Sequence, residues 1–131
     1  MAAGVTGAAG AAQRPSARLD YVELPSATAH ELTRAFYAKA MGWSFTDYGP
    51  EYSASESGAG LLGLNGDRAD ALSAPLPLIR TDALEALLDA VAAAGGTISR
   101  PIFAYPGGRR FQFIDPGGNE VGVYQPSADV A

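Results

Sequence analysis

The sequence contains one order of predicted elements twice, and this repeat constrains the fold more than any other feature. The stretch LDYVELP at residues 19–25 has the alternation and the β-branched and aromatic residues of a strand, and apolar residues then recur at helical spacing over 32–40. Three short strands are predicted next, at 43–48, 51–56 and 60–65. The first module therefore spans residues 19–65 and has the order βαβββ.

The same order returns after a polar stretch of small residues, 66–74, which has the composition of a linker. PLPLIR at 75–80 is the first predicted strand of this second module, and its prolines favour an edge strand or the mouth of a barrel. A helix with the apolar stripe Leu84, Leu87, Leu88 and Val91 follows. Three strands at 97–104, 109–114 and 119–124 complete the second module, which spans residues 75–126.

Capping signals bound both predicted helices. Thr28 and Glu31 have the spacing of a capping box at the start of the first helix, and Gly42 is placed to end it. Asp82 with Glu85 is expected to cap the second helix, which Gly95 and Gly96 close.

Two βαβββ modules predict an α+β fold with two four-stranded sheets, each covered on its outer face by one helix. Alternation along each strand assigns one row of side chains to the helices and the other to a concave surface. The helix-facing row is predicted to hold Val22, Leu24, Leu62, Leu64, Leu76, Leu78, Val121 and Val123. The concave row is predicted to hold Tyr21, Glu23, Leu61, Gly63, Pro75, Pro77, Glu120, Gly122 and Tyr124.

Length and composition indicate one domain of 131 residues, with an Ala- and Gly-rich arm at 1–18 and a short tail at 127–131. The absence of cysteine excludes disulfides and thiolate metal sites and fits a cytoplasmic protein. A net charge of −5 argues against nucleic acid as a partner, because phosphate binding requires a basic surface. No signal peptide or membrane-spanning segment is expected.

Four stretches of this chain resemble one known family. They are YVELP, RAFYAKAMGWSF, DALEALLDAVAAAGG and FQFIDPGGNEVGVYQ, and the resemblance extends over residues 19–126. The chain is similar to the vicinal oxygen chelate superfamily of glyoxalase I, extradiol dioxygenases and bleomycin and fosfomycin resistance proteins, and especially to its small, uncharacterised single-domain members. This resemblance implies a half-open barrel made of the two modules, and a homodimer in which the modules pair side by side or by swapping.

The resemblance also implies where a metal would be held. In metal-dependent members, His or Glu ligands project into the cavity from the first and last strands of each module, and those positions here are Tyr21, Gly63 or a neighbour, Pro75 or Pro77, and Gly122. None of these residues is a histidine or a carboxylate. The single histidine, His30, is expected to face solvent in the first helical turn. We therefore predict no metal or other cofactor at the family positions, with a divalent metal at an unplaced site as the alternative.

Glu23 is the sharpest candidate for chemistry, because alternation directs its charged side chain into the concave surface. A buried carboxylate needs a partner, and either an ion pair with Arg80, Arg109 or Arg110 or a role in catalysis would supply one. Glu23 and Tyr21 together are candidates for a metal-free acid and base pair.

The predicted function is the binding of a small aromatic or amphipathic molecule in the concave cavity. Phe36 and Trp43 are expected to anchor the hydrophobic core instead. A metal-dependent lyase or dioxygenase of the glyoxalase type is the alternative function, and a peptide-binding module is a third. The residues predicted to bind the ligand are Tyr21, Glu23, Tyr52, Phe111, Phe113, Gly122 and Tyr124.

Overall fold

The structure is a computed structural model, and it describes residues 15–55, 61–70 and 73–127. Most of the predicted arm, most of the tail, the end of the strand predicted at 51–56 and two linker residues lie outside the described residues. Among the helices of the described part, none is long and apolar enough to cross a membrane.

The observed elements follow the predicted order in both modules. The first module consists of β1 (Arg18–Pro25), α2 (His30–Met41), β2 (Thr46–Asp47), β3 (Tyr52–Ser55) and β4 (Leu62–Asn65). A short 3-10 helix, η1 (Arg68–Asp70), lies in the predicted linker. The second module consists of β5 (Leu76–Arg80), α3 (Leu84–Ala93), β6 (Thr97–Tyr105), β7 (Gly108–Ile114) and β8 (Glu120–Pro126).

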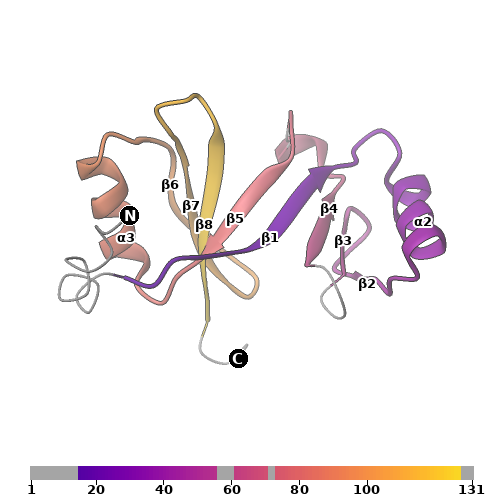
Figure 1. Cartoon of the computed structure of the whole chain (residues 1–131). Coiled ribbons are helices and arrows are strands. Elements are labelled where there is room, and N and C mark those ends of the chain that lie inside the picture. Colours follow the sequence, from indigo (N-terminus) through magenta and orange to yellow (C-terminus); the bar gives the residue numbers. More distant parts are fainter. Residues whose placement is uncertain (1–14, 56–60, 71–72, 128–131) are drawn as a thin grey trace, which may run out of the picture.

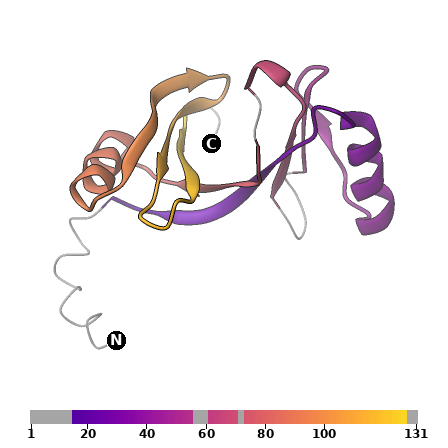
Figure 2. The same ribbon diagram turned by 90° about the horizontal axis from the view of Figure 1, so that it is seen from above.

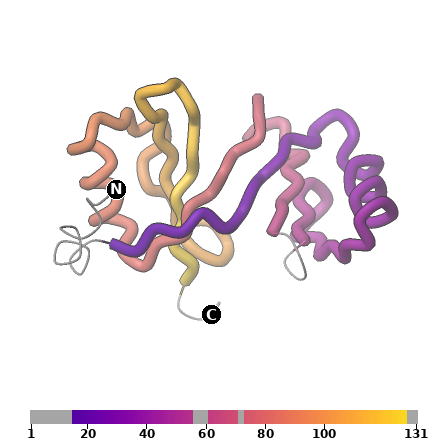
Figure 3. Tube along the Cα trace, in the orientation of Figure 1, coloured from indigo at the N-terminus to yellow at the C-terminus, as the bar shows by residue number. Residues whose placement is uncertain are grey.

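The eight strands of the described residues form one curved sheet in the order β2-β3-β4-β1-β5-β8-β7-β6. The modules meet where β1 pairs antiparallel with β5 in the middle of the sheet, as the two neighbouring tubes in Figure 3 show. Figure 1 and Figure 2 show the two helices at opposite ends of the molecule, with the strands curving between them. The predicted α+β half-open barrel is thus confirmed as an open, curled sheet with two outer helices. The prediction of two separate four-stranded sheets is wrong, because the pairing of β1 with β5 joins the modules into one sheet.

The second module contains a tightly packed core between α3 and the sheet. Leu84 of α3, Phe111 of β7 and Val123 of β8 are fully buried there. Each such side chain contributes roughly 1.5–3 kcal/mol by leaving water. Seven half-buried side chains surround the three: Ile79, Leu87, Leu88, Val91, Ile98, Ile102 and Phe113.

The first module lacks an equivalent core beneath its helix. No residue of α2 is buried, and Leu32 and Phe36 are 77% and 57% exposed. The prediction that Phe36 anchors the core is therefore wrong, because its ring packs edge-on against Tyr37 at the surface of α2. Trp43 is half-buried and stacks on Tyr37 with 5.8 Å between ring centroids. The α2 helix leaves an apolar face open to solvent.

The helix starts differ from the predicted caps. The N-cap residues are Ala29 and Ala83, neither of which caps through its side chain. The backbone amide of Leu84 instead donates a hydrogen bond to Gln125 Oε1 at 3.0 Å. A side chain from β8 thus satisfies a free backbone N–H at the start of α3. Gly42 does end α2, with φ of 73° in the left-handed region.

Two strand predictions also need correction. The strand expected at 43–48 shortens to Thr46–Asp47, which pairs with β3 at one edge of the sheet. The proline-containing strand β5 lies in the centre of the sheet, not at an edge. The centre tolerates Pro77 because the pairing of β5 with β8 begins at the next residue, Leu78.

Candidate functional site on the concave face

Strand register brings four positions together on the concave face of the sheet. Tyr21 of β1 pairs with Leu78 of β5, and Leu78 pairs in turn with Gly122 of β8. Glu23 of β1 is the register partner of Gly63 in β4. Residues paired in register project to the same side of a sheet, so Tyr21, Glu23, Gly63 and Gly122 share one face as alternation predicted.

The assignment of β5 was wrong by one residue. Leu76 and Leu78 were predicted to face the helices, but they pair with Glu23 and Tyr21 and are buried on the concave face. Pro77 pairs with Val22 and belongs to the opposite face. A break in the register of β1 between Leu19 and Tyr21 changes the pairing along this strand.

The two glycines of this face lie under neighbouring side chains. A β-carbon at Gly122 would collide with the Leu78 side chain, and one at Gly63 would collide with the hydroxyls of Tyr21 and Tyr52. Both glycines permit a close approach that a larger residue would prevent. The space beside Gly122 is therefore filled by a leucine of the adjacent strand.

Glu23 lies at the centre of a buried polar cluster. It is the most buried of the described charged residues, with 3% of the residue exposed. The Tyr52 hydroxyl donates to Glu23 Oε2 at 2.8 Å, and Arg110 Nη1 lies 3.6 Å from the same oxygen. Asn65 Nδ2 donates a longer bond to Oε1, at 3.4 Å. The expected ion pair of Glu23 is thus present, and its partner is Arg110.

Two tyrosines extend this cluster along the face. The hydroxyls of Tyr21 and Tyr52 share a hydrogen bond of 2.7 Å, and the Tyr52 hydroxyl donates its hydrogen to Glu23. Burial raises the pKa of Tyr52 far above its usual value, and the charge of Glu23 raises it further. Tyr52 is consequently a hydrogen-bond donor at neutral pH.

The side of the cluster formed by β7 contains two polar atoms without partners. Arg110 Nε and Gln112 Oε1 are buried and make no hydrogen bond within the part of the chain that the structure describes. Both residues lie on the concave side of β7, where Arg110 pairs with Tyr124 and Gln112 with Gly122. Arg110 also lies over the Phe103 ring, 5.4 Å from its centroid. A donor and an acceptor on this face are therefore unsatisfied.

Tyr124 occupies the same face next to Tyr21, with 6.5 Å between the ring centroids. Its hydroxyl donates to Asp20 Oδ1 at 2.9 Å. Burial raises the pKa of Tyr124 to about 12, and the bond to Asp20 adds to the effect. The two rings form an aromatic strip across the centre of the sheet.

Phe111 and Phe113 do not line this surface. They pair with Val123 and Val121 on the helix side of the sheet, and Phe111 belongs to the core beneath α3. The prediction that these two rings bind a ligand on the concave face is contradicted by their register. The polar residues that alternate with them, Arg110 and Gln112, occupy that face instead.

His30 has a role that the sequence did not predict. It is half-buried as the first residue of α2, with Nδ1 2.7 Å from Ser26 Oγ and Nε2 3.1 Å from Ser53 Oγ. The expectation that His30 faces solvent is wrong, because its ring bridges the start of α2 to β3. It is not one of the residues of the Glu23 cluster.

The residues at the family's metal positions do not fit a metal ion. The expected positions, Tyr21, Gly63, Pro75 or Pro77, and Gly122, offer one side-chain oxygen donor, and the β5 residues that do lie on the concave face are Leu76 and Leu78. Divalent metals of this class are held by several imidazole or carboxylate groups. Over residues 15–55, 61–70 and 73–127, there is no group of three or more His, Cys, Asp or Glu side chains with the spacing of a metal site.

Arg110, Gln112 and Asn65 belong to the site but were not predicted as ligand-binding residues. Alternation in RRFQF contained the signal for the first two, because aromatic residues facing the core direct their polar neighbours to the other side. Asn65 ends β4, where no pattern distinguishes a buried amide from a turn residue.

Comparisons with solved structures agree with this fold. A methylmalonyl-CoA epimerase from Mycobacterium tuberculosis is 14% identical with a TM-score of 0.69, and the match covers 86% of this chain and 90% of that one. The Mn(II)-bound glyoxalase from Novosphingobium aromaticivorans is 23% identical with a TM-score of 0.63, covering 88% of this chain and 41% of that one. A superfamily member from Vibrio splendidus 12B01 is 18% identical with a TM-score of 0.58, covering 85% and 98%.

A search of curated proteins finds no match to this sequence. The family model of the Glyoxalase/Bleomycin resistance protein/Dioxygenase superfamily matches residues 18–123. That match begins at the first residue of β1 and ends within β8, so it includes both modules. The chain belongs to the glyoxalase, bleomycin resistance protein and dioxygenase superfamily.

Proposed function

We propose that this protein binds a small amphipathic molecule with an aromatic ring on its concave face, and that it does so without a metal at the family positions. The observation that carries the proposal is the pair of buried, unpartnered atoms Arg110 Nε and Gln112 Oε1. Buried polar atoms nearly always have a hydrogen-bond partner, so a donor and an acceptor without one favour a bound molecule that supplies both.

The surroundings of these atoms support an aromatic ligand. Tyr21, Tyr124 and Phe103 offer ring surfaces on the same face. An apolar surface with a few fixed polar groups is the usual composition of a small-molecule site. The Glu23–Arg110 pair contributes a fixed charge distribution that favours ligands with a defined polar end.

The alternative function, metal-dependent lyase or dioxygenase chemistry, receives less support from these residues. The expected metal positions hold glycine and proline beside Tyr21, and the Glu23 carboxylate is held by Arg110, Tyr52 and Asn65. Three side chains of the protein thus already interact with the Glu23 carboxylate. Ligand binding, in contrast to this chemistry, requires no metal ion at the site.

Binding can be tested with three neutral probes that share one ring. Benzamide supplies a donor and an acceptor, phenol supplies a hydroxyl, and toluene supplies neither. We expect benzamide to raise the melting temperature in proportion to the logarithm of its concentration, with a smaller effect of phenol and none of toluene. Gln112→Leu and Tyr21→Phe should reduce the benzamide effect, whereas Tyr37→Phe on α2 should preserve it. Equal effects of toluene and benzamide, or no effect of any probe, would contradict the proposal.

We also propose that the protein is a homodimer that pairs through α2. Leu32 and Phe36 lie one turn apart on the helix and are both exposed. Glu31 stands in the first turn and Lys39 in the last, so two antiparallel copies of α2 place each glutamate opposite a lysine. A twofold pairing joins apolar to apolar surface and opposite charges at each end.

A further inference from the structure

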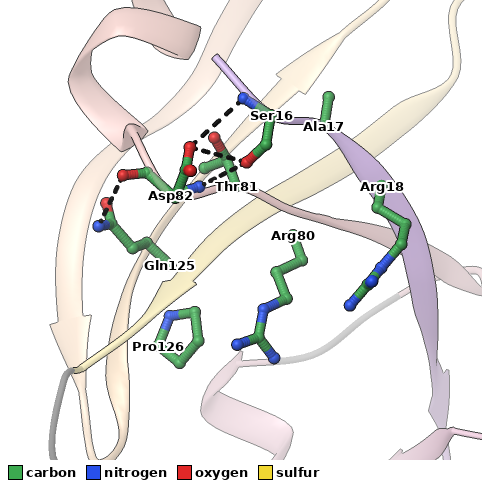
Figure 4. Close-up of a pocket in the computed structure, with 8 residues that line it drawn as sticks. All are labelled: Ser16, Ala17, Arg18, Arg80, Thr81, Asp82, Gln125 and Pro126. Atoms are coloured by element: carbon green, nitrogen blue, oxygen red, sulfur yellow. Dashed lines mark hydrogen bonds between the residues drawn. The ribbon is translucent and has the colours of Figure 1, made fainter. Parts of the chain in front are cut away.

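A hollow in the structure lies at the start of β1 and the end of β5. It has a volume of about 560 Å³, within the range of small-molecule pockets. Figure 4 shows Arg18 and Arg80 extending to the same side of the sheet, past Pro126. The remaining lining residues are Ser16, Ala17, Thr81, Asp82 and Gln125.

Strand register places these arginines in a row that crosses the concave face. Arg18 pairs with Arg80, Arg80 pairs with Tyr124, and Tyr124 pairs with Arg110. Neighbouring strands are about 4.8 Å apart, so Arg80 and Arg110 stand on either side of Tyr124 at a backbone separation of roughly 10 Å. The row runs from the hollow to the unpartnered atoms of the proposed binding site.

The three arginines of this row differ in whether a carboxylate neutralises their charge. Arg110 pairs with Glu23, and Arg18 has a loose contact with Asp20 at 3.5 Å. Arg80 is exposed and forms no ion pair with any described residue. Its guanidinium lies near the Tyr124 hydroxyl and opposes the rise in the pKa of Tyr124. Like charges directly opposite each other on adjacent strands are destabilising, so the pair Arg18 and Arg80 favours an anion between them.

The carboxylates near the hollow are already engaged. Asp82 Oδ1 accepts from the Ser16 hydroxyl at 2.7 Å, and Asp20 accepts from Tyr124 at 2.9 Å. These hydrogen bonds keep both acids on partners other than Arg80. A planar guanidinium without a carboxylate matches the two oxygens of a carboxylate or phosphate group.

We infer that Arg18 and Arg80 form a subsite for the oxyanion of a small organic acid whose ring lies over Tyr124. The position of the ring rests on the proposed function, while the anion subsite stands on the arginine row alone. The ligand class is thereby narrowed from amphipathic molecules with an aromatic ring to aromatic carboxylates or aryl phosphate monoesters.

Benzoate and benzamide test this subsite, because they have the same shape and differ in charge. We expect benzoate to bind about tenfold more tightly than benzamide, as a charge-assisted bond predicts. Arg80→Gln should abolish that difference, and Arg80→Lys should restore part of it. Arg68→Gln is the matched control, because this substitution removes the same charge at an exposed position. Arg68 precedes β5, whereas Arg80 ends that strand. Melting temperatures of the free variants check that each one folds.

Amide chemical shifts separate failure of the subsite from failure of the proposed function. Inorganic phosphate and benzoate should shift the amides of Thr81 and Gln125, and Arg80→Gln should remove those shifts. Shifts by phosphate without any benzamide binding would support the anion subsite and overturn the proposed function. Equal affinity for benzoate and benzamide, unchanged in Arg80→Gln, would overturn the subsite and leave the proposed function standing. The same titration with phenyl phosphate identifies which oxyanion binds more tightly.

Discussion

The side chain of Leu78 occupies the space that a β-carbon on Gly122 would take, and the two residues are register partners on adjacent strands. In this superfamily the resemblance assigns metal ligands to these strands. Here a leucine and a glycine pack together at that point, so the centre of the sheet is closed by an apolar contact. The polar groups of this face lie in the Glu23 cluster, which includes Arg110, and in Gln112 of the same strand β7.

Gly122→Ala is expected to destabilise the protein, because the new methyl group meets Leu78 in a buried position. Overpacking of this kind costs about 1–3 kcal/mol. Urea unfolding of the variant measures the loss.

Leu78→Ala tests whether the contact itself is responsible. Alone it should cost about 2–5 kcal/mol by leaving a cavity. Combined with Gly122→Ala it should cost less than the sum of the two single changes, because the methyl group enters space that the leucine vacates. Strict additivity would show that Leu78 does not fill the position beside Gly122.

Alternation alone predicted which residues of β1 and β8 lie on the concave face, because polar or small residues alternate with apolar ones along both strands. It failed on β5, where PLPLI offers apolar residues at every position and only pairing decides which row faces which side. Leu78 therefore exchanged faces with Pro77. The register of β5 depends on contacts with β1 and β8, which no local pattern contains.

Glu23→Gln is expected to destabilise the protein through Arg110. The pair is buried, so removal of the carboxylate charge leaves a guanidinium without its counterion. Breaking a buried ion pair costs about 3–5 kcal/mol. Thermal and urea unfolding should both register the loss.

The double variant Glu23→Gln with Arg110→Met removes both charges and should recover much of that stability. Glu85→Gln, which breaks the solvent-exposed pair with Arg109, serves as the matched control and should have little effect. A loss in Glu85→Gln as large as that in Glu23→Gln would show that burial of the pair is not the cause.

Stability should fall between about pH 10 and pH 12. The pKa of Tyr124 rises from 10.0 to about 12 in the folded chain, so above pH 10 the unfolded chain releases a proton that the folded chain retains. The raised pKa values of Tyr52 and Tyr105 act in the same direction. The contribution is complete below pH 10 and is lost as the pH rises toward 12.

Tyr52→Phe should make this decline in stability with pH shallower, because burial and the charge of Glu23 keep Tyr52 protonated in the folded protein. Free energies of unfolding measured at intervals from pH 9 to pH 12 provide the comparison, with Tyr37→Phe as the control. Identical slopes in Tyr52→Phe and in the unchanged protein would rule out a contribution of Tyr52.

The candidate site was predictable in part, for a reason that its residues illustrate. Glu23 stood out because a charge on a cavity-facing position must find a partner. Arg110 was one of three arginines that met this requirement, and choosing it needed the pairing of β7 with β8 and the curvature that brings β7 toward β1. Phe111 and Phe113 were misassigned because an aromatic ring suits a core and a ligand site equally well.

Charge reversal on α2 should control dimerisation. In an antiparallel pair of α2 helices Glu31 faces Lys39 of the other copy, so Glu31→Lys or Lys39→Glu alone brings like charges together. Each single variant should shift sedimentation toward the monomer, and Phe36→Glu should do so most strongly because it places a charge among the apolar side chains. The combined variant Glu31→Lys with Lys39→Glu restores opposite charges at both ends and should recover the dimer. A monomer in the unchanged protein, or a combined variant no better than its parents, would refute pairing through α2.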